Sequence, residues 1–162
     1  MRSTDLPRII AALKEPIQLF VRDSRVRVSL LINRSGQVLA QHGFTSSYEV
    51  MNVASLAAAA HASSRALADI TQSGGWTHLH HAGERHELFL APLGTPVEPL
   101  ILVTIFDSES SLGLVQLFFH QLADRVSGLP ELQSARASAD QKSFEHDLEA
   151  GVERAFGTRR DA

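Results

Sequence analysis

The sequence predicts an α+β domain in the order helix, two strands, helix, three strands, helix. Three observations carry this prediction: two helical stripes of apolar residues, two strand pairs joined by short glycine-containing turns, and one strand that is apolar on both faces. Short turns between paired strands make the sheet largely antiparallel. The chain has 162 residues, 44% of them hydrophobic and 20% charged, which suits one globular core.

The first helix and the first strand pair follow from periodicity. Apolar residues recur at steps of four and three, and they are Leu6, Ile10, Leu13, Ile17 and Phe20. Pro16 removes a helical hydrogen bond, so we expect a kink or an interruption there. Residues 25–32 alternate as a strand, the turn 34–37 contains a glycine, and residues 38–40 return as the second strand of a hairpin.

The second helix is rich in alanine and serine. The S-x-x-E spacing from Ser46 to Glu49 predicts its start, and Gly74 and Gly75 follow its expected end near Thr71. Two strands at 76–82 and 86–93 then flank a short turn and predict a second hairpin.

The last strand and the last helix are the clearest elements of the pattern. Residues 100–106 are almost entirely apolar, which predicts a central strand covered on both faces. Residues 107–111 follow it and supply candidate N-caps for the next helix. Asp107 follows a buried strand, where catalytic acids often lie, but it is interpreted as a helix cap. The apolar stripe of that helix is Leu112, Val115, Phe119, Leu122 and Val126, and Gly128 and Pro130 end it.

Two segments are predicted: a domain at 1–128 and a polar C-terminal tail at 129–162. Four apolar residues of the tail are spaced by four, which predicts an amphipathic helix that needs another surface for stability: Phe144, Leu148, Val152 and Phe156.

Composition narrows the functional classes. The net charge is −3 and the arginines form no stripe, so no nucleic-acid partner is expected. The chain has no cysteine, which excludes disulfides and thiolate chemistry. The N-terminus lacks a signal-peptide pattern, and the longest apolar run, 99–106, is too short to span a membrane. We therefore expect a soluble cytoplasmic protein.

Four histidines within nine residues are the strongest candidate for chemistry: His78, His80, His81 and His86. Three imidazoles can hold zinc, but polar residues on an exposed edge strand also discourage aggregation, and this second interpretation is favoured. There is no nucleophile elbow and no phosphate-binding loop. The sequence therefore predicts no enzyme, no cofactor and no metal.

The alanine-rich helix is predicted to be an interface. Its larger residues form one stripe expected to lie on the sheet: Val53, Leu56, Ala60, Ser63, Leu67 and Ile70. The opposite side is small and is expected to let a second backbone approach, through Ala54, Ala58, His61, Ala62 and Arg65. Alanine is also the best helix former, which is the alternative explanation. An exposed helix of that kind normally carries Glu and Lys, and residues 50–64 contain neither.

Taken in order, these motifs resemble the roadblock/dynein light chain superfamily, and more closely its bacterial MglB-type regulators of small Ras-like GTPases. The matching segments are LLINRSGQVLAQHG, NVASLAAAAHASSRAL, HHAGERHELFL and LVTIFDSESSLGLVQLFF. The resemblance covers residues 5–128, and its specificity comes from the order and spacing of the motifs.

The resemblance implies a five-stranded antiparallel sheet with helices on both faces. It also implies a homodimer in which the alanine-rich helices pack together and the edge strands pair, which places His78, His80 and His81 near the dimer seam. The function it implies is stimulation of GTP hydrolysis by a separate MglA-type GTPase without a catalytic group from this chain. A roadblock scaffold without that activity is the alternative.

Overall fold

The computed structural model describes residues 6–43, 47–137, 140 and 143. Its helices and strands are α1 (Leu6–Ser24), β1 (Val28–Ile32), β2 (Val38–His42), α2 (Ser47–Ile70), β3 (Leu79–Ala82), β4 (Glu87–Leu93), β5 (Leu100–Phe106) and α3 (Leu112–Ser127). A fourth helical stretch covers residues 130–137. The predicted order of elements is confirmed.

The five strands form one antiparallel sheet in the order β2-β1-β5-β4-β3. The apolar strand β5 lies at the centre, between β1 and β4, as its composition predicts. The short strand β3 lies at one edge, beside β4, in the register His80↔Phe89. The predicted edge position of the histidine-rich strand is therefore confirmed.

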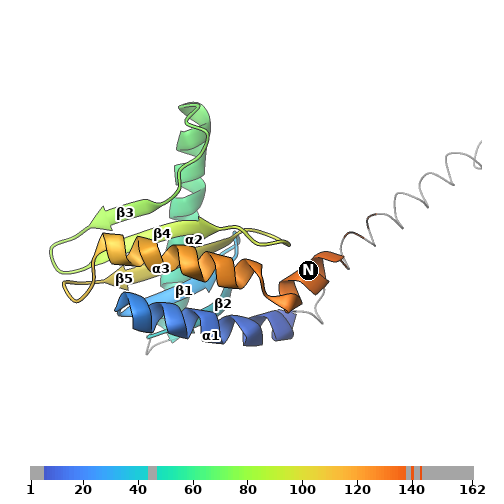
Figure 1. The fold of residues 1–162 in the computed structure, drawn as a ribbon. Helices are drawn as coiled ribbons and strands as arrows, with labels where there is room; N and C mark the ends of the chain where they lie inside the picture. The colour runs from blue at the N-terminus through green and yellow to red at the C-terminus, as the bar shows by residue number, and fades with distance from the viewer. Residues whose placement is uncertain (1–5, 44–46, 138–139, 141–142, 144–162) are drawn as a thin grey trace, which may run out of the picture.

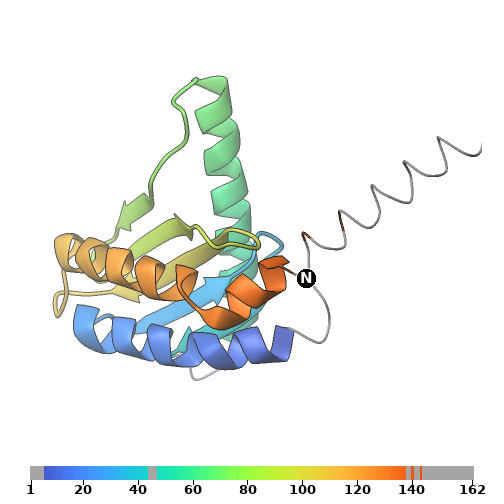
Figure 2. The ribbon, with the colours of Figure 1, turned by 45° about the vertical axis from the view of Figure 1, so that its right-hand side comes forward.

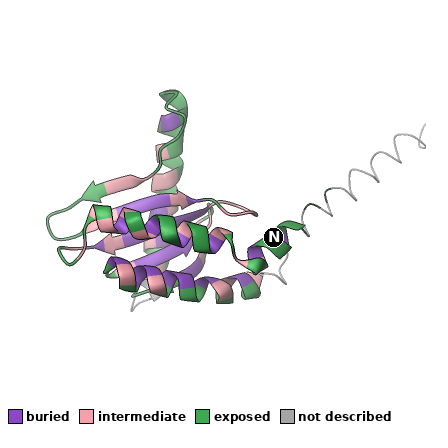
Figure 3. Cartoon of the chain, in the orientation of Figure 1, coloured by how far each residue is buried: buried purple, intermediate pink, exposed green. Residues whose placement is uncertain are grey.

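Helices cover both faces of the sheet. Figures 1 and 2 show α1 and α3 side by side on one face and α2 on the other. Side chains of β5 alternate between the two cores: Leu102 and Phe106 pack under α1 and α3, whereas Ile101 and Val103 pack under α2. The strands β1 and β5 and most of β4 are accordingly buried, whereas β3 and the outer sides of α1 and α3 are partly or fully exposed (Figure 3).

The predicted interruption of the first helix at Pro16 is wrong, because α1 is continuous through that residue. Pro16 is buried and lines the groove between α1 and α3. We attribute its tolerance to this packing, which offsets the lost backbone hydrogen bond.

The C-terminal helical stretch packs on the same core as α1 and α3. Leu132 and Ala135 are buried there, although they lie beyond the predicted domain end at residue 128. The apolar residues that predict the amphipathic tail (Phe144, Leu148, Val152 and Phe156) lie outside the described residues, as does Ser46, the first residue of the predicted capping box.

The turn after β2 passes very close to β1 at Gly43. Gly43 has φ of 88°, and a Cβ atom there would clash with the carbonyl oxygen of Arg27. Gly74 has a similar φ of 73° but nothing within 4 Å of the corresponding position. The two glycines share a conformation and differ in crowding.

We expect Gly43→Ala to lower the free energy of unfolding by roughly 2 kcal/mol more than Gly74→Ala does, because only the first adds overpacking to the left-handed strain. Urea unfolding of the two variants measures the difference. Equal destabilisation would show that the approach to β1 relaxes without cost.

Candidate protein-interaction site

The side of α2 that faces the sheet is lined with alanine. Ala54 and Ala57 are 1% and 6% exposed and belong to the core under α2. The large apolar residues point away from the sheet instead, since Leu56 is 72% exposed and Ile70 is 78% exposed. The predicted orientation of α2 is therefore wrong in part. Leu56, Leu67 and Ile70 of the stripe expected on the sheet are exposed, and Ala54 of the side expected to be free is buried.

The small residues do admit a close neighbour, but the neighbour belongs to the same chain. The turn between β1 and β2 packs against α2, and a Cβ atom added at Gly36 would lie 3.5 Å from the Ala54 carbonyl oxygen and from the Ala58 Cβ. Ala54 is thus unavailable to a partner and Ala58 is half-buried. Of the predicted contact residues, Ala62 and Arg65 are exposed and His61 is partly exposed.

An apolar seam runs along α2, and we call it the outer stripe: Val53, Leu56, Ala60, Ser63, Leu67 and Ile70. Four of these residues are exposed, whereas Val53 and Ala60 are partly buried and also pack on the core under α2. The spacing of three and four residues in the outer stripe is the a/d pattern by which helices pack against other helices. Met51, next to its N-terminal end, is 67% exposed as well. A run of exposed large apolar residues on one helix marks a surface that another molecule covers.

Beside the outer stripe lies an open apolar groove, which we call the hairpin groove. One wall is α2 at Val53, Leu56 and Ala60, and the floor includes Val103 and Ile105 of β5. The other wall is the β3–β4 hairpin, where Leu88 contributes apolar surface and His81, Ala82, Gly83, His86 and Glu87 form the rim. The groove exists because α2 lies over β1, β2 and β5 and leaves part of the sheet uncovered.

The C-terminal half of α2 projects beyond the sheet (Figures 1 and 2), which exposes Leu67 and Ile70. Its end is closed by the segment that follows it. The Thr71 hydroxyl donates to the Leu67 carbonyl at 2.8 Å, and the Ser73 backbone N–H donates to the Ala68 carbonyl at 3.0 Å. These bonds satisfy carbonyls that a helix end otherwise leaves free.

The edge histidines are held by different neighbours and do not converge. His80 Nε2 lies 2.6 Å from Glu87 Oε2, and its ring stacks on Phe106. His78 Nε2 lies 3.2 Å from Gln116 Nε2 of α3, while His81 is exposed. Among the described residues no group of three His, Asp or Glu side chains is placed to hold a metal ion.

Asp107 is not the cap of α3, contrary to the sequence-based expectation. Ser111 is the N-cap, and its hydroxyl accepts from the Leu114 N–H. Asp107 instead pairs with Arg27 across the β5–β1 junction and accepts from the Glu109 N–H. The hydrogen bond from Arg27 holds the pKa of Asp107 below its usual range, so this carboxylate is a structural ion pair rather than a catalytic acid.

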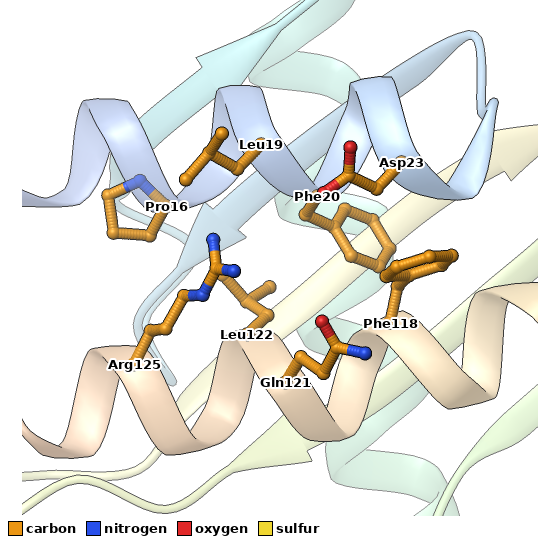
Figure 4. Close-up of a pocket in the computed structure, with 8 residues that line it drawn as sticks. All are labelled: Pro16, Leu19, Phe20, Asp23, Phe118, Gln121, Leu122 and Arg125. Atoms are coloured by element: carbon orange, nitrogen blue, oxygen red, sulfur yellow. The ribbon is translucent and has the colours of Figure 1, made fainter.

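A small groove between α1 and α3 is the other feature of note (Figure 4). Phe20 and Phe118 face each other across it, and Arg125 reaches from α3 toward α1. Its acidic residue, Asp23, is already paired with Arg22 at 2.7 Å. We interpret this groove as the packing seam of two helices.

Two arginines act on His61 of α2. Burial lowers the pKa of His61, and the positive charges of Arg65 and Arg34 lower it further. Arg34 belongs to the β1–β2 turn, so the fold brings together residues far apart in the sequence. His61 and Arg65 are candidates from the sequence alone but Arg34 is not, because periodicity says nothing about which loop reaches a helix.

A five-stranded sheet with one fully covered face and one open apolar groove has the architecture of a protein-interaction module. No helix among the described residues is both long and apolar enough to cross a membrane. The Roadblock/LC7 domain family matches residues 13–106, and the chain belongs to this family. Roadblock domains serve as regulatory and scaffold proteins.

Solved structures of MglB are similar to this chain. MglB of Myxococcus xanthus is 27% identical with a TM-score of 0.62, over 74% of this chain and 92% of its own. MglB of Thermus thermophilus, described as a gliding protein, is 25% identical with a TM-score of 0.63, over 83% and 95%. A further MglB structure, described as having a tetrameric arrangement, gives the same values. Among curated proteins no sequence matches.

We expect Arg65→Gln to raise the pKa of His61, because it removes a positive charge that disfavours the imidazolium ion. Arg34→Gln should act in the same direction. Titration of the His61 ring signals by NMR measures both shifts, and Arg8→Gln, on α1, is the matched control. An unchanged His61 pKa in both variants would contradict the arrangement of the three basic side chains.

Proposed function

We propose that this chain acts as a homodimer that regulates a small Ras-like GTPase of the MglA type. One observation supports the dimer. The outer stripe and the hairpin groove are both apolar and largely exposed, and both include residues of α2. The stripe extends onto the projecting half of α2, whereas the groove flanks the half that lies on the sheet. A two-fold axis across α2 would lay the projecting half of each copy over the groove of the other.

Such a contact is self-complementary, as two-fold interfaces are. The middle of the outer stripe is Ala60 and Ser63, and these small residues allow two helices to cross at close range. Leu56 and Leu67 flank them and supply apolar area on either side of the crossing. The edge strand β3, with His80 and His81, would lie beside its counterpart in the second copy, as the resemblance implies.

The proposed effect on the GTPase is positioning rather than chemistry. Among the described residues the acids and histidines near α2 and β3 are engaged in ion pairs or stacking, or lie alone at the surface. The remaining contact candidates are His61, Ala62 and Arg65, on or beside the projecting half of α2. The likeness to MglB structures supports a GTPase as the partner. A scaffold role without stimulation of hydrolysis is the alternative that the assays below separate.

We expect Leu67→Glu to weaken the homodimer at least about tenfold, because it places a charge where a leucine would be buried. Sedimentation equilibrium of the full chain measures the dissociation constant. The matched control is Leu117→Glu, since Leu117 is 54% exposed on α3, on the opposite face of the sheet. A Leu67→Glu protein that dimerises as the unmodified chain does would refute the α2 interface.

We expect the unmodified chain to accelerate single-turnover GTP hydrolysis by the Ras-like GTPase of the same organism. Arg65→Ala should weaken binding while leaving the rate at saturating dimer close to normal, because Arg65 acts as a contact. If Arg65 instead entered the active site of the GTPase, its removal would lower the rate of GTP hydrolysis about a thousandfold or more. If Arg65→Ala still binds the GTPase but no longer accelerates hydrolysis at saturating dimer, Arg65 is catalytic. If the unmodified chain binds the GTPase without accelerating hydrolysis, the scaffold role is favoured.

A further inference from the structure

A small pocket lies where the projecting half of α2 leaves the sheet, and we call it the basic pocket. Its polar lining comes from His61, Ser64 and Arg65 of α2. His78 also borders it, but the His78 ring is turned toward Gln116 of α3. The apolar lining of the pocket is Trp76, Leu79, Leu90 and Pro92. There is room for little more than one water-sized group, so the pocket suits the end of a side chain and not a nucleotide.

Arg34 belongs to the β1–β2 turn, which packs on α2 near this pocket and is held by hydrogen bonds. The Asn33 side-chain oxygen accepts from the Ser35 N–H at 3.0 Å and from the Gln37 N–H at 2.9 Å. Gly36, in the same turn, lies against α2 at Ala54 and Ala58. Because the turn is fixed on α2 about one helical turn before His61, the charge of Arg34 acts on His61, as the charge of Arg65 does.

Nothing among the described residues neutralises this charge. Arg34 and Arg65 make no ion pair there, whereas Arg22 and Arg27 each have a carboxylate partner. Asp69, one helical turn after Arg65, is exposed and is not within ion-pair distance of it. Two arginines that both act on His61 and have no counter-charge create a local positive potential on a chain whose net charge is −3.

We propose that the basic pocket and Arg34 together bind an acidic segment of a protein partner, with one carboxylate beside Arg65 and a second beside Arg34. Trp76, 42% exposed at the rim, offers an apolar surface for the residues between the two carboxylates. The inference rests on the proposed function in one respect, because it takes the acidic segment to be part of the surface of the GTPase.

A protein segment fits better than a nucleic acid. The basic surface consists of two arginines and a partly buried histidine. This is too few cationic groups to follow the phosphate backbone of a nucleic acid. The net negative charge of the chain opposes the approach of a polyanion from any other direction. Binding of an acidic segment through paired charges also steers association and orients the partner, which suits a regulator that acts by positioning.

The test uses the full chain and a fluorescein-labelled peptide of alternating glutamate and glycine, followed by fluorescence anisotropy at low salt. The double variant Arg34→Gln/Arg65→Gln should bind the peptide about tenfold more weakly, and added salt should weaken binding to the unmodified chain. Arg8→Gln/Arg25→Gln removes the same charge from exposed positions elsewhere and should bind as the unmodified chain does.

Three outcomes overturn the inference: no saturable binding of the acidic peptide, equal binding by the double variant, or equal losses in both double variants. A fourth outcome also overturns the inference. If a single-stranded oligothymidylate binds more tightly than the peptide and this binding is lost in Arg34→Gln/Arg65→Gln, the site binds nucleic acid. Binding of the GTPase to the same proteins separates the two proposals. If the GTPase binds neither the unmodified chain nor the variants, the proposed function is wrong. Binding of the peptide still tests the basic pocket in that case.

Discussion

The structure depends on one constraint, which is that β5 is apolar on both faces and must be covered on both. On one face α1 and α3 do this with large side chains, and the helical stretch at 130–137 extends the same core. Within the described part of the chain, α2 alone covers the other face, and it can lie close to the sheet because its inner side is alanine. One helix cannot cover five strands. The uncovered part of the sheet becomes the hairpin groove, so the groove follows from the number of described helices on that face.

Much of the fold was accessible from the sequence. The stripes of α1 and α3 contain Leu, Ile and Phe at helical spacing, and the burial of Leu13, Phe119 and Leu122 matches the side that periodicity selects. The central position of β5 follows from its lack of a polar face. The strand pairs follow from short turns. In each case the local pattern is compatible with one arrangement, because the large apolar side chains of the segment must be buried in a core.

The orientation of α2 was not accessible, for a physical reason. A helix with alanines on one side and leucines on the other is usually placed with the leucines inward, since they gain most from burial. Here Leu56 and Leu67 are exposed in the single chain and Ala54 is buried. The inner side of α2 packs against the Gly36 turn, which is a tertiary contact between segments that are separate in the sequence. The same kind of contact brings Arg34 to His61, and no pattern within either segment contains it.

The closed end of α2 has a consequence for motion. The Thr71 and Ser73 bonds complete the last turn of the helix, but beyond the sheet few side chains hold that turn in place. Segments with little packed surface open locally at a free energy far below that of global unfolding. A second molecule laid along these turns would raise the local opening energy toward that of the sheet without altering the fold. Amide exchange at the end of α2 would therefore report occupancy of this surface directly, with the amides of β5 serving as an internal reference.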